Sequence, residues 1–167
     1  MWLQSFEVGN LRALAALTPL PRVQLIADHG APYDLVAQGD PRVYADLISS
    51  AGLAEIAGYA QAIGPDKSLV IPRRADGNLA QPTTLVTDAH AHGLAVHPWT
   101  FRAENAFLPV QFRAGSAPGE PGNLQAELLA YLGSGIDGFF TDQADLGVAA
   151  RNAFLRQPGA GAGNVSR

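Results

Sequence analysis

The chain contains no cysteine among its 167 residues. It therefore has no disulfide bonds, no thiolate metal ligands and no cysteine nucleophile. It also lacks any apolar run that approaches the roughly 20 residues of a membrane-spanning helix. The residues that follow Met1 include neither a basic segment nor a long apolar one, so we expect no signal peptide in this chain.

Positive charge is scarce as well. Eleven Lys and Arg stand against 15 Asp and Glu, which gives a formal net charge of −4. The chain thus lacks the basic footprint of a nucleic-acid-binding protein, although local positive charge or a metal could still hold an anionic substrate. A hydrophobic fraction of 47% and a charged fraction of 16% are typical of one folded domain with a sizeable core.

Common catalytic motifs are absent too: there is no G-x-S-x-G elbow, no phosphate-binding glycine loop and no H-E-x-x-H motif. His90 and His92 lie two apart on an expected helix, so they face different directions and suit a solvated helix end better than a metal pair. His29 could act as a ligand or base, but its neighbours suit a turn. Glu7 could bind a metal or begin a helix.

Strand-like and helix-like segments alternate along the chain. We expect strands at 2–6, 23–27, 94–101 and 136–140, with a brief extended piece at 69–71. We expect helices at 10–17, 43–62 with interruptions at Gly52 and Gly58, 83–92, 123–132 and 145–154. This alternation favours right-handed parallel β-α units. Because a closed barrel needs about eight strands, four or five strands form either a small open sheet or part of a barrel.

The closing strand and helix carry the most informative pattern. The apolar run 136–140 ends at Thr141 and Asp142, and we expect Asp145 to cap the helix that follows. In parallel α/β folds the carboxyl ends of the strands hold ligands. Asp142 could therefore serve a site, or it could orient its own turn through an Asx-type bond.

A second strand, L-A-V-H-P-W-T-F at 94–101, offers a wall for a pocket. Alternation places Trp99 and Phe101 on one face of this strand. Near the carboxyl end of an inner strand, Trp99 could line a ligand pocket or simply belong to the core. Arg102 follows, and it could contact a phosphate or pair with Glu104.

Four segments stand out when taken in order: Q-S-F-E at 4–7, G-P-D-K-S at 64–68, H-P-W-T-F-R with E-N at 97–105, and G-I-D-G-F-F-T-D at 135–142. Together they resemble the glycerophosphodiester phosphodiesterases of the bacterial, periplasmic-type branch. The resemblance implies an α/β fold, the C-terminal half of a TIM (β/α)8 barrel of the PLC-like phosphodiesterase type. It implies a partial domain at 1–156, and we expect the Gly- and Ala-rich tail 157–167 to be disordered.

The family resemblance also implies an activity: metal-dependent hydrolysis of glycerophosphodiesters to glycerol 3-phosphate and an alcohol, within lipid and glycerol metabolism. Family members use histidines in H-R-G and H-D motifs as general base and acid, and carboxylates to hold Ca²⁺ or Mg²⁺. None of those motifs occurs here; His29 precedes Gly30 and comes after Q-S-F-E. We therefore expect no catalytic and no metal-binding residue in this chain, and negligible activity from it alone.

What carries over from the family is a substrate-binding wall. By resemblance, Gln4, Ser5 and Phe6 on one strand, and Trp99 and Thr100 on another, flank the glycerol moiety. The implied partner is a small glycerophosphodiester, with no nucleic acid and no membrane span, and the resemblance implies a periplasmic location for the full-length parent.

Two alternatives remain open. One is a non-catalytic binding or assembly module, a half-barrel that associates through its exposed edges with another copy or chain. The other is a small α/β hydrolase that uses His29, His97 and Asp142, which requires these three side chains to lie close together.

Overall fold

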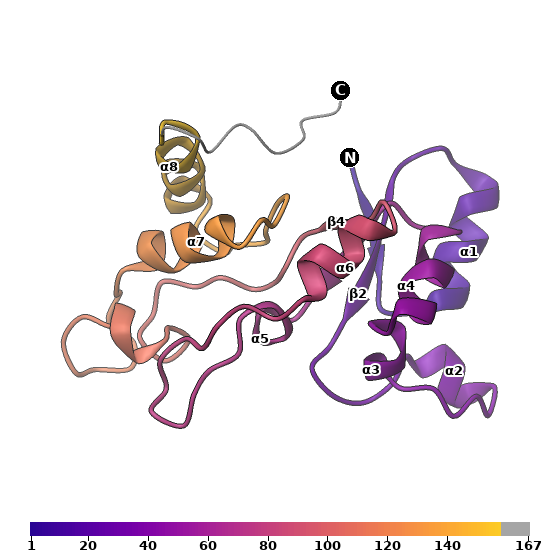
Figure 1. Cartoon of the computed structure of the whole chain (residues 1–167), viewed down its shortest axis with the longest axis horizontal. Coiled ribbons are helices and arrows are strands. Elements are labelled where there is room, and N and C mark those ends of the chain that lie inside the picture. The colour runs from indigo at the N-terminus through magenta and orange to yellow at the C-terminus, as the bar shows by residue number, and fades with distance from the viewer. Residues whose placement is uncertain (158–167) are drawn as a thin grey trace.

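The computed structural model describes residues 1–157, and its strands and helices alternate as the sequence predicts (Figure 1). Four parallel strands form one sheet in the order β1-β2-β3-β4. These strands are β1 Leu3–Ser5, β2 Arg22–Ile26, β3 Ala62–Pro65 and β4 Ala95–Val96. A fifth parallel segment continues the sheet, because Thr141 forms a parallel bridge with Phe101 and the Phe101 N–H donates to the Phe140 carbonyl (2.9 Å). The predicted parallel α/β architecture is confirmed.

The helices follow the strands in turn. They are α1 Val8–Leu17, α2 Tyr33–Ala37, α3 Tyr44–Leu47, α4 Ser50–Ala57, α5 Lys67–Val70, α6 Leu85–Ala91, α7 Leu124–Gly133 and α8 Ala144–Leu155, with a 3-10 helix at Val110–Phe112. Figure 1 shows α1 to α4 at one end of the molecule and α7 with α8 at the other. None of these helices is long and apolar enough to cross a membrane.

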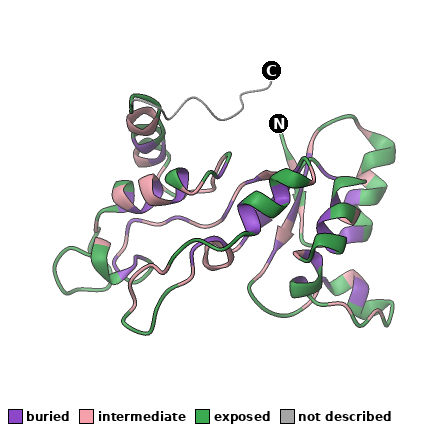
Figure 2. Ribbon diagram, viewed as in Figure 1, coloured by how far each residue is buried: buried purple, intermediate pink, exposed green. Residues whose placement is uncertain are grey.

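One apolar cluster joins the helices to one face of the sheet. Ile26, Ile63 and Val96 contribute from three strands, and each is completely buried. The helices bury the side that faces this cluster and expose the other (Figure 2). Such one-sided burial is the physical reason for the helical spacing of apolar residues in the sequence.

The other face of the sheet carries side chains that helices do not cover. Trp2 and Phe6, which flank β1, remain 46% and 38% exposed. Their rings meet those of His97 and Trp99 edge to face, with centroids 5.1 Å and 5.6 Å apart. Gly64 on β3 is closely packed against β2, because an added Cβ would lie 2.6 Å from Leu25 Cδ2.

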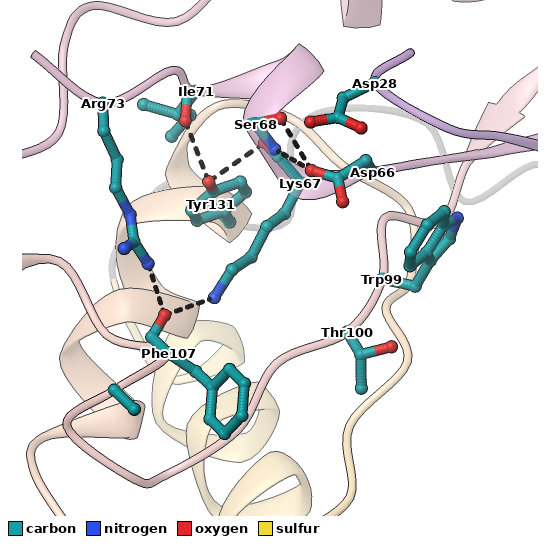
Figure 3. A pocket seen from close by; sticks show the side chains of 11 residues that line it. Asp28, Asp66, Lys67, Ser68, Ile71, Arg73, Trp99, Thr100, Phe107 and Tyr131 are labelled. Atoms are coloured by element: carbon teal, nitrogen blue, oxygen red, sulfur yellow. Dashed lines mark hydrogen bonds between the residues drawn. The ribbon is translucent and has the colours of Figure 1, made fainter. Parts of the chain in front are cut away.

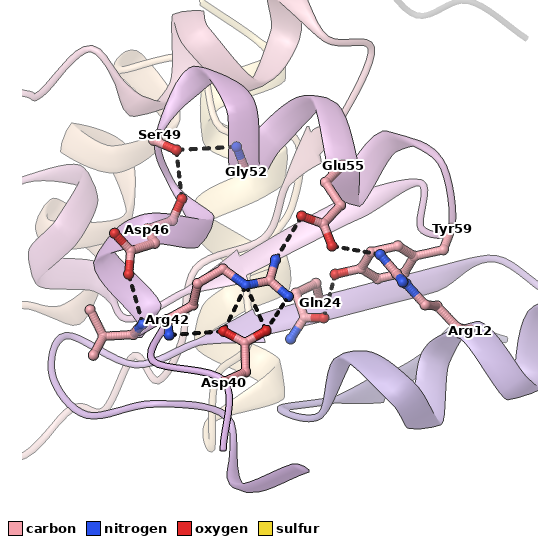
Figure 4. Close-up of polar contacts among 10 residues, drawn as sticks. Arg12, Gln24, Asp40, Arg42, Asp46, Ser49, Gly52, Glu55 and Tyr59 are labelled. Atoms are coloured by element: carbon pink, nitrogen blue, oxygen red, sulfur yellow. Dashed lines mark hydrogen bonds and ion pairs between the residues drawn. The ribbon is translucent and has the colours of Figure 1, made fainter. Parts of the chain in front are cut away.

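A polar network fastens the region between α2 and α4 to α1 (Figure 4). The Arg42 guanidinium pairs with Asp40 and with Glu55, both at 2.8 Å. The same Glu55 pairs with Arg12 of α1 at 2.5 Å, and Arg12 lies over the Tyr59 ring. Hydrogen bonds from Arg42 hold the pKa of Asp40 below its usual value. The network tethers the long connection between β2 and β3.

Four predicted elements have wrong boundaries. Of the strand expected at 94–101 only Ala95–Val96 is a strand, and 136–140 contains none, although the next residue, Thr141, forms the bridge with Phe101. The helix expected at 43–62 ends with α4 at Ala57, and Ala62 opens β3; the strand A-I-G-P escapes notice because it is short and contains glycine and proline, which have low strand propensity. The extended piece expected at 69–71 is largely helix α5, which begins where the Asp66 carboxylate accepts a hydrogen bond from the Ser68 N–H (2.8 Å).

Other expectations change in detail. The N-cap of α8 is Gln143, and Asp145 lies in the first turn, where negative charge is also favourable. Gly52 lies inside α4, because the break falls one turn earlier at the N-cap Ser49. Phe101 is fully buried against Tyr131 and does not share the face of Trp99. Of the tail predicted to be disordered, residues 158–167 lie outside the described residues.

Candidate substrate-binding cleft

The carboxyl ends of β2, β3 and β4 border a cleft of about 360 Å³ (Figure 3). Each strand supplies part of the wall through residues within the first four positions after it: Asp28 after β2, Asp66 with Lys67 after β3, and Trp99 with Thr100 after β4. This is the edge where parallel α/β folds hold ligands. The 106–107 loop and Tyr131 of α7 close the opposite side.

Trp99 and Phe6 form an aromatic wall. The Trp99 Nε1–H donates to the Gly64 carbonyl at 2.6 Å, which fixes the indole plane. The Phe6 ring meets the indole almost perpendicularly, at 87° between planes, and also contacts Tyr44. Two rings held in this way present a rigid apolar surface beside the polar groups of the cleft.

Of the five predicted site residues, three lie in or beside the cleft and two do not. Trp99 and Thr100 line the cleft, and Phe6 contacts Trp99. The Ser5 hydroxyl accepts hydrogen bonds from the Glu7 N–H and from the Asn10 side chain, both at 3.1 Å, so it is engaged at the start of α1. Gln4 is exposed in the middle of β1. Their contact with a substrate stays a prediction.

A buried ion pair that the sequence analysis did not predict lies on the other wall. The Lys67 ammonium donates to Glu127 Oε1 at 2.8 Å and to the Phe107 carbonyl at 3.2 Å. The Lys67 side chain is 13% exposed and that of Glu127 is completely buried. Burial lowers the pKa of Lys67 and raises the pKa of Glu127, while their mutual attraction opposes both shifts. The G-P-D-K-S segment marks Lys67, but only the fold brings Glu127 to it.

The three residues of the hydrolase alternative are not brought together. His29 pairs with its neighbour Asp28 at 2.5 Å, and His97 packs against Trp2 on the uncovered face of the sheet. Asp142 pairs with Arg102 at 2.8 Å. No hydrogen bond or ion pair within residues 1–157 joins any two of the three, which argues against a shared catalytic centre.

Of the two alternatives for Arg102, contact with a phosphate or pairing with Glu104, the pairing with Glu104 is not found among residues 1–157. Arg102 pairs with Asp142, and its guanidinium lies over the Phe107 ring, 4.2 Å from the centroid. The Asp142 carboxylate follows the last strand segment, so the ion pair connects it to the loop after β4. Arg102 and Asp142 thus contact each other, and a site role for Asp142 stays a prediction.

The described residues do not fit a divalent cation. Within residues 1–157 no three His, Asp or Glu side chains come together in a way that could hold a metal ion. His90 pairs with Asp137 at 2.8 Å, and His92 bonds to the Ser50 hydroxyl at 3.2 Å. These two histidines thus connect α6 and its C-cap to Asp137 and to α4. We assign no chemical step to a metal.

The sequence has clear relatives. The profile of the Glycerophosphoryl diester phosphodiesterase family matches residues 1–146. A curated protein of Arabidopsis thaliana, Glycerophosphodiester phosphodiesterase GDPD6, is 34% identical over 143 residues, which are 85% of this chain and 35% of that protein. The chain therefore spans about a third of the length of this relative.

Two crystal structures assigned to glycerophosphoryl diester phosphodiesterases share the fold. The structure from Agrobacterium tumefaciens str. C58 has a TM-score of 0.52 and 18% identity, and the match covers 92% of this chain and 44% of that one. For the structure from Silicibacter pomeroyi DSS-3 the TM-score is 0.54 and the identity 19%, with 91% and 38% of the two chains covered. The parallel sheet is thus part of a TIM-barrel-type α/β fold, as predicted.

Proposed function

Because the chain belongs to the glycerophosphoryl diester phosphodiesterase family, we propose that it binds glycerophosphodiesters through the wall that Phe6, Trp99 and Thr100 form. The observation that supports this most directly is the fixed aromatic pair beside the cleft. The rings offer apolar contact to the carbon chain of glycerol. The Thr100 hydroxyl offers a hydrogen bond to a glycerol hydroxyl.

We further propose that this chain alone hydrolyses its substrate negligibly. Phosphodiester hydrolysis requires a base, an acid and neutralisation of the phosphate charge. His97 packs against Trp2 outside the cleft, and burial lowers its pKa, so it is poorly placed to move a proton at a bound phosphodiester. Within residues 1–157 no group of three or more His, Asp or Glu side chains could hold Ca²⁺ or Mg²⁺ by itself.

The binding proposal is tested by titration of the chain with glycerophosphocholine, followed through the backbone amide signals in NMR spectra, which remain available in both tryptophan variants. Trp99→Leu removes the ring that lines the cleft and should weaken binding roughly tenfold, about 1.4 kcal/mol. Trp2→Leu is the matched control, since Trp2 lies on the same sheet face but does not line the cleft. Equal loss in both variants, or no loss in either, would contradict the proposal.

One observation favours the assembly module as a second candidate. Within residues 1–157, β1 pairs with β2 alone, so its other edge carries unpaired backbone groups beside the exposed rings of Trp2 and Phe6. Such an edge is a template for another strand. Analytical ultracentrifugation distinguishes the two candidates: a stable, cooperatively unfolding dimer without glycerophosphocholine binding supports the module.

A further inference from the structure

We propose that Lys67 and Arg73 form an oxyanion subsite in the cleft that binds a phosphate group. Both side chains line the cleft. The two cations converge on one backbone oxygen, because the Lys67 ammonium donates to the Phe107 carbonyl at 3.2 Å and the Arg73 guanidinium donates to the same atom (Figure 3). Two cationic groups from successive parts of the chain therefore point to one corner of the cleft.

The charges at this corner do not cancel. Glu127 neutralises one positive charge through its 2.8 Å contact with Lys67, which leaves one net positive charge for the three groups. The positive charge of Arg73 also lowers the pKa of Lys67, in addition to the larger effect of burial. A bound anion would relieve this repulsion between the cations. Arg73 is exposed, and within residues 1–157 its side chain donates only to the Phe107 carbonyl, so its other N–H groups can meet a ligand from the cleft.

The corner is held in place before any ligand arrives. The Tyr131 hydroxyl contacts two carbonyl oxygens of the α5 region, that of Lys67 at 3.0 Å and that of Ile71 at 3.1 Å. At the start of α5, Asp66 Oδ1 accepts from the N–H and the hydroxyl of Ser68. Lys67 is thus fixed at its backbone and at its ammonium group. A preorganised pair of donors costs less entropy on binding than two free side chains.

A phosphate group suits this donor set. A guanidinium presents several N–H groups in one plane to phosphate oxygens, and an ammonium adds a compact charge. Asp28 and Asp66 occupy another part of the cleft wall, so an anion is favoured only at the Lys67 and Arg73 corner. The group could belong to a phosphodiester or to a phosphate monoester, and the choice of the phosphodiester rests on the proposed function.

The subsite is tested by isothermal titration of the whole chain, at low ionic strength, with inorganic phosphate, sn-glycerol 3-phosphate and glycerophosphocholine. Arg73→Gln should lower the affinity for all bound phosphates about tenfold. Arg74→Gln is the matched control, because Arg74 is the exposed neighbour, pairs with Asp76 at 3.4 Å and does not line the cleft. It should change affinity less than about twofold.

A second variant guards against a folding artefact. Lys67→Met alone would strand the buried carboxylate, so Lys67→Met with Glu127→Gln removes both charges; circular dichroism establishes that it folds. This variant should also lose phosphate affinity. The subsite is overturned if the wild-type chain binds none of the three compounds, or if Arg74→Gln weakens binding as much as Arg73→Gln.

The titration separates this inference from the proposed function. Binding of inorganic phosphate that depends on Arg73, without binding of glycerophosphocholine, supports the subsite and contradicts the proposed function. Binding of glycerophosphocholine that is unchanged in Arg73→Gln supports the proposed function and overturns the subsite. Tighter binding of glycerol 3-phosphate than of glycerophosphocholine assigns the site to the monoester, and the reverse order assigns it to the diester.

Discussion

At the scale of single residues, His97 shows how burial changes the chemistry of a side chain. Its ring meets Trp2 edge to face at 5.1 Å, and Gly138 packs so closely that an added Cβ would lie 2.8 Å from the imidazole. Burial lowers the pKa of His97 below 6.5, and the charge of Asp137 opposes this shift more weakly. A histidine in this position is a packing residue and stays neutral near neutral pH.

This burial predicts how stability depends on pH. As the pH falls through 6.5, the unfolded chain takes up a proton on His97 that the folded chain does not, so the free energy of unfolding decreases. His97→Phe keeps an aromatic ring at the site and should lose this part of the dependence. Urea unfolding at a series of pH values between about 8 and 5 measures it.

His29→Gln is the matched control, because His29 is exposed and contacts only its neighbour Asp28 among the described residues. This variant should keep the slope of the wild-type chain. If His97→Phe loses stability on acidification as steeply as the wild type, burial of His97 is not the cause.

At the scale of secondary-structure elements, the close packing of β3 against side chains of β2 depends on Gly64. An added Cβ would lie 2.6 Å from Leu25 Cδ2 and 3.1 Å from Val23 Cγ1. Gly64→Ala should therefore strain the contact between β2 and β3 and lower the free energy of unfolding by about 1–3 kcal/mol. Thermal or urea unfolding provides the measurement.

Gly133→Ala serves as the comparison. Gly133 ends α7, and its added Cβ would meet nothing within 4 Å. The alanine should leave stability unchanged or raise it by up to about 1 kcal/mol, because alanine favours helix. Equal losses in both variants would show that crowding at β3 is not what Gly64 prevents.

The elements also show what the sequence can and cannot predict. The helix at α7 is predictable because Asn123 caps it and leucines recur along one face. The strand β3 is missed because four residues with glycine and proline carry no strand pattern. The Lys67–Glu127 pair joins residues 60 positions apart, so no local pattern signals it. The periodicity of apolar residues does not predict contacts that depend on how the elements pack together.

The candidate site likewise has a part that the sequence predicts and a part that it does not. Trp99 is predictable because it lies near the carboxyl end of an apolar segment, and it does line the cleft. Arg73 follows no recognisable motif and enters the site only because the chain after α5 returns toward Phe107. The sequence therefore indicates the aromatic wall, whereas the basic corner becomes visible only in three dimensions.

At the scale of the whole molecule, the parallel sheet has one face packed on helices and one face that exposes Trp2 and Phe6. The chain covers 35% of its relative from Arabidopsis thaliana, and its cleft combines an aromatic wall with a basic corner. Binding groups gather at one edge of the sheet, and no histidine of residues 1–157 lines the cleft. We therefore expect the chain to bind a glycerophosphodiester without cleaving it.

The measurement that tests this claim most directly follows glycerophosphocholine by ³¹P NMR in the presence of the purified chain and Ca²⁺ or Mg²⁺. We predict a phosphodiester signal that shifts on binding in a Trp99-dependent manner, with no more glycerol 3-phosphate than in a sample without protein. Hydrolysis at rates typical of enzymes, about 1 s⁻¹ or more, would contradict it.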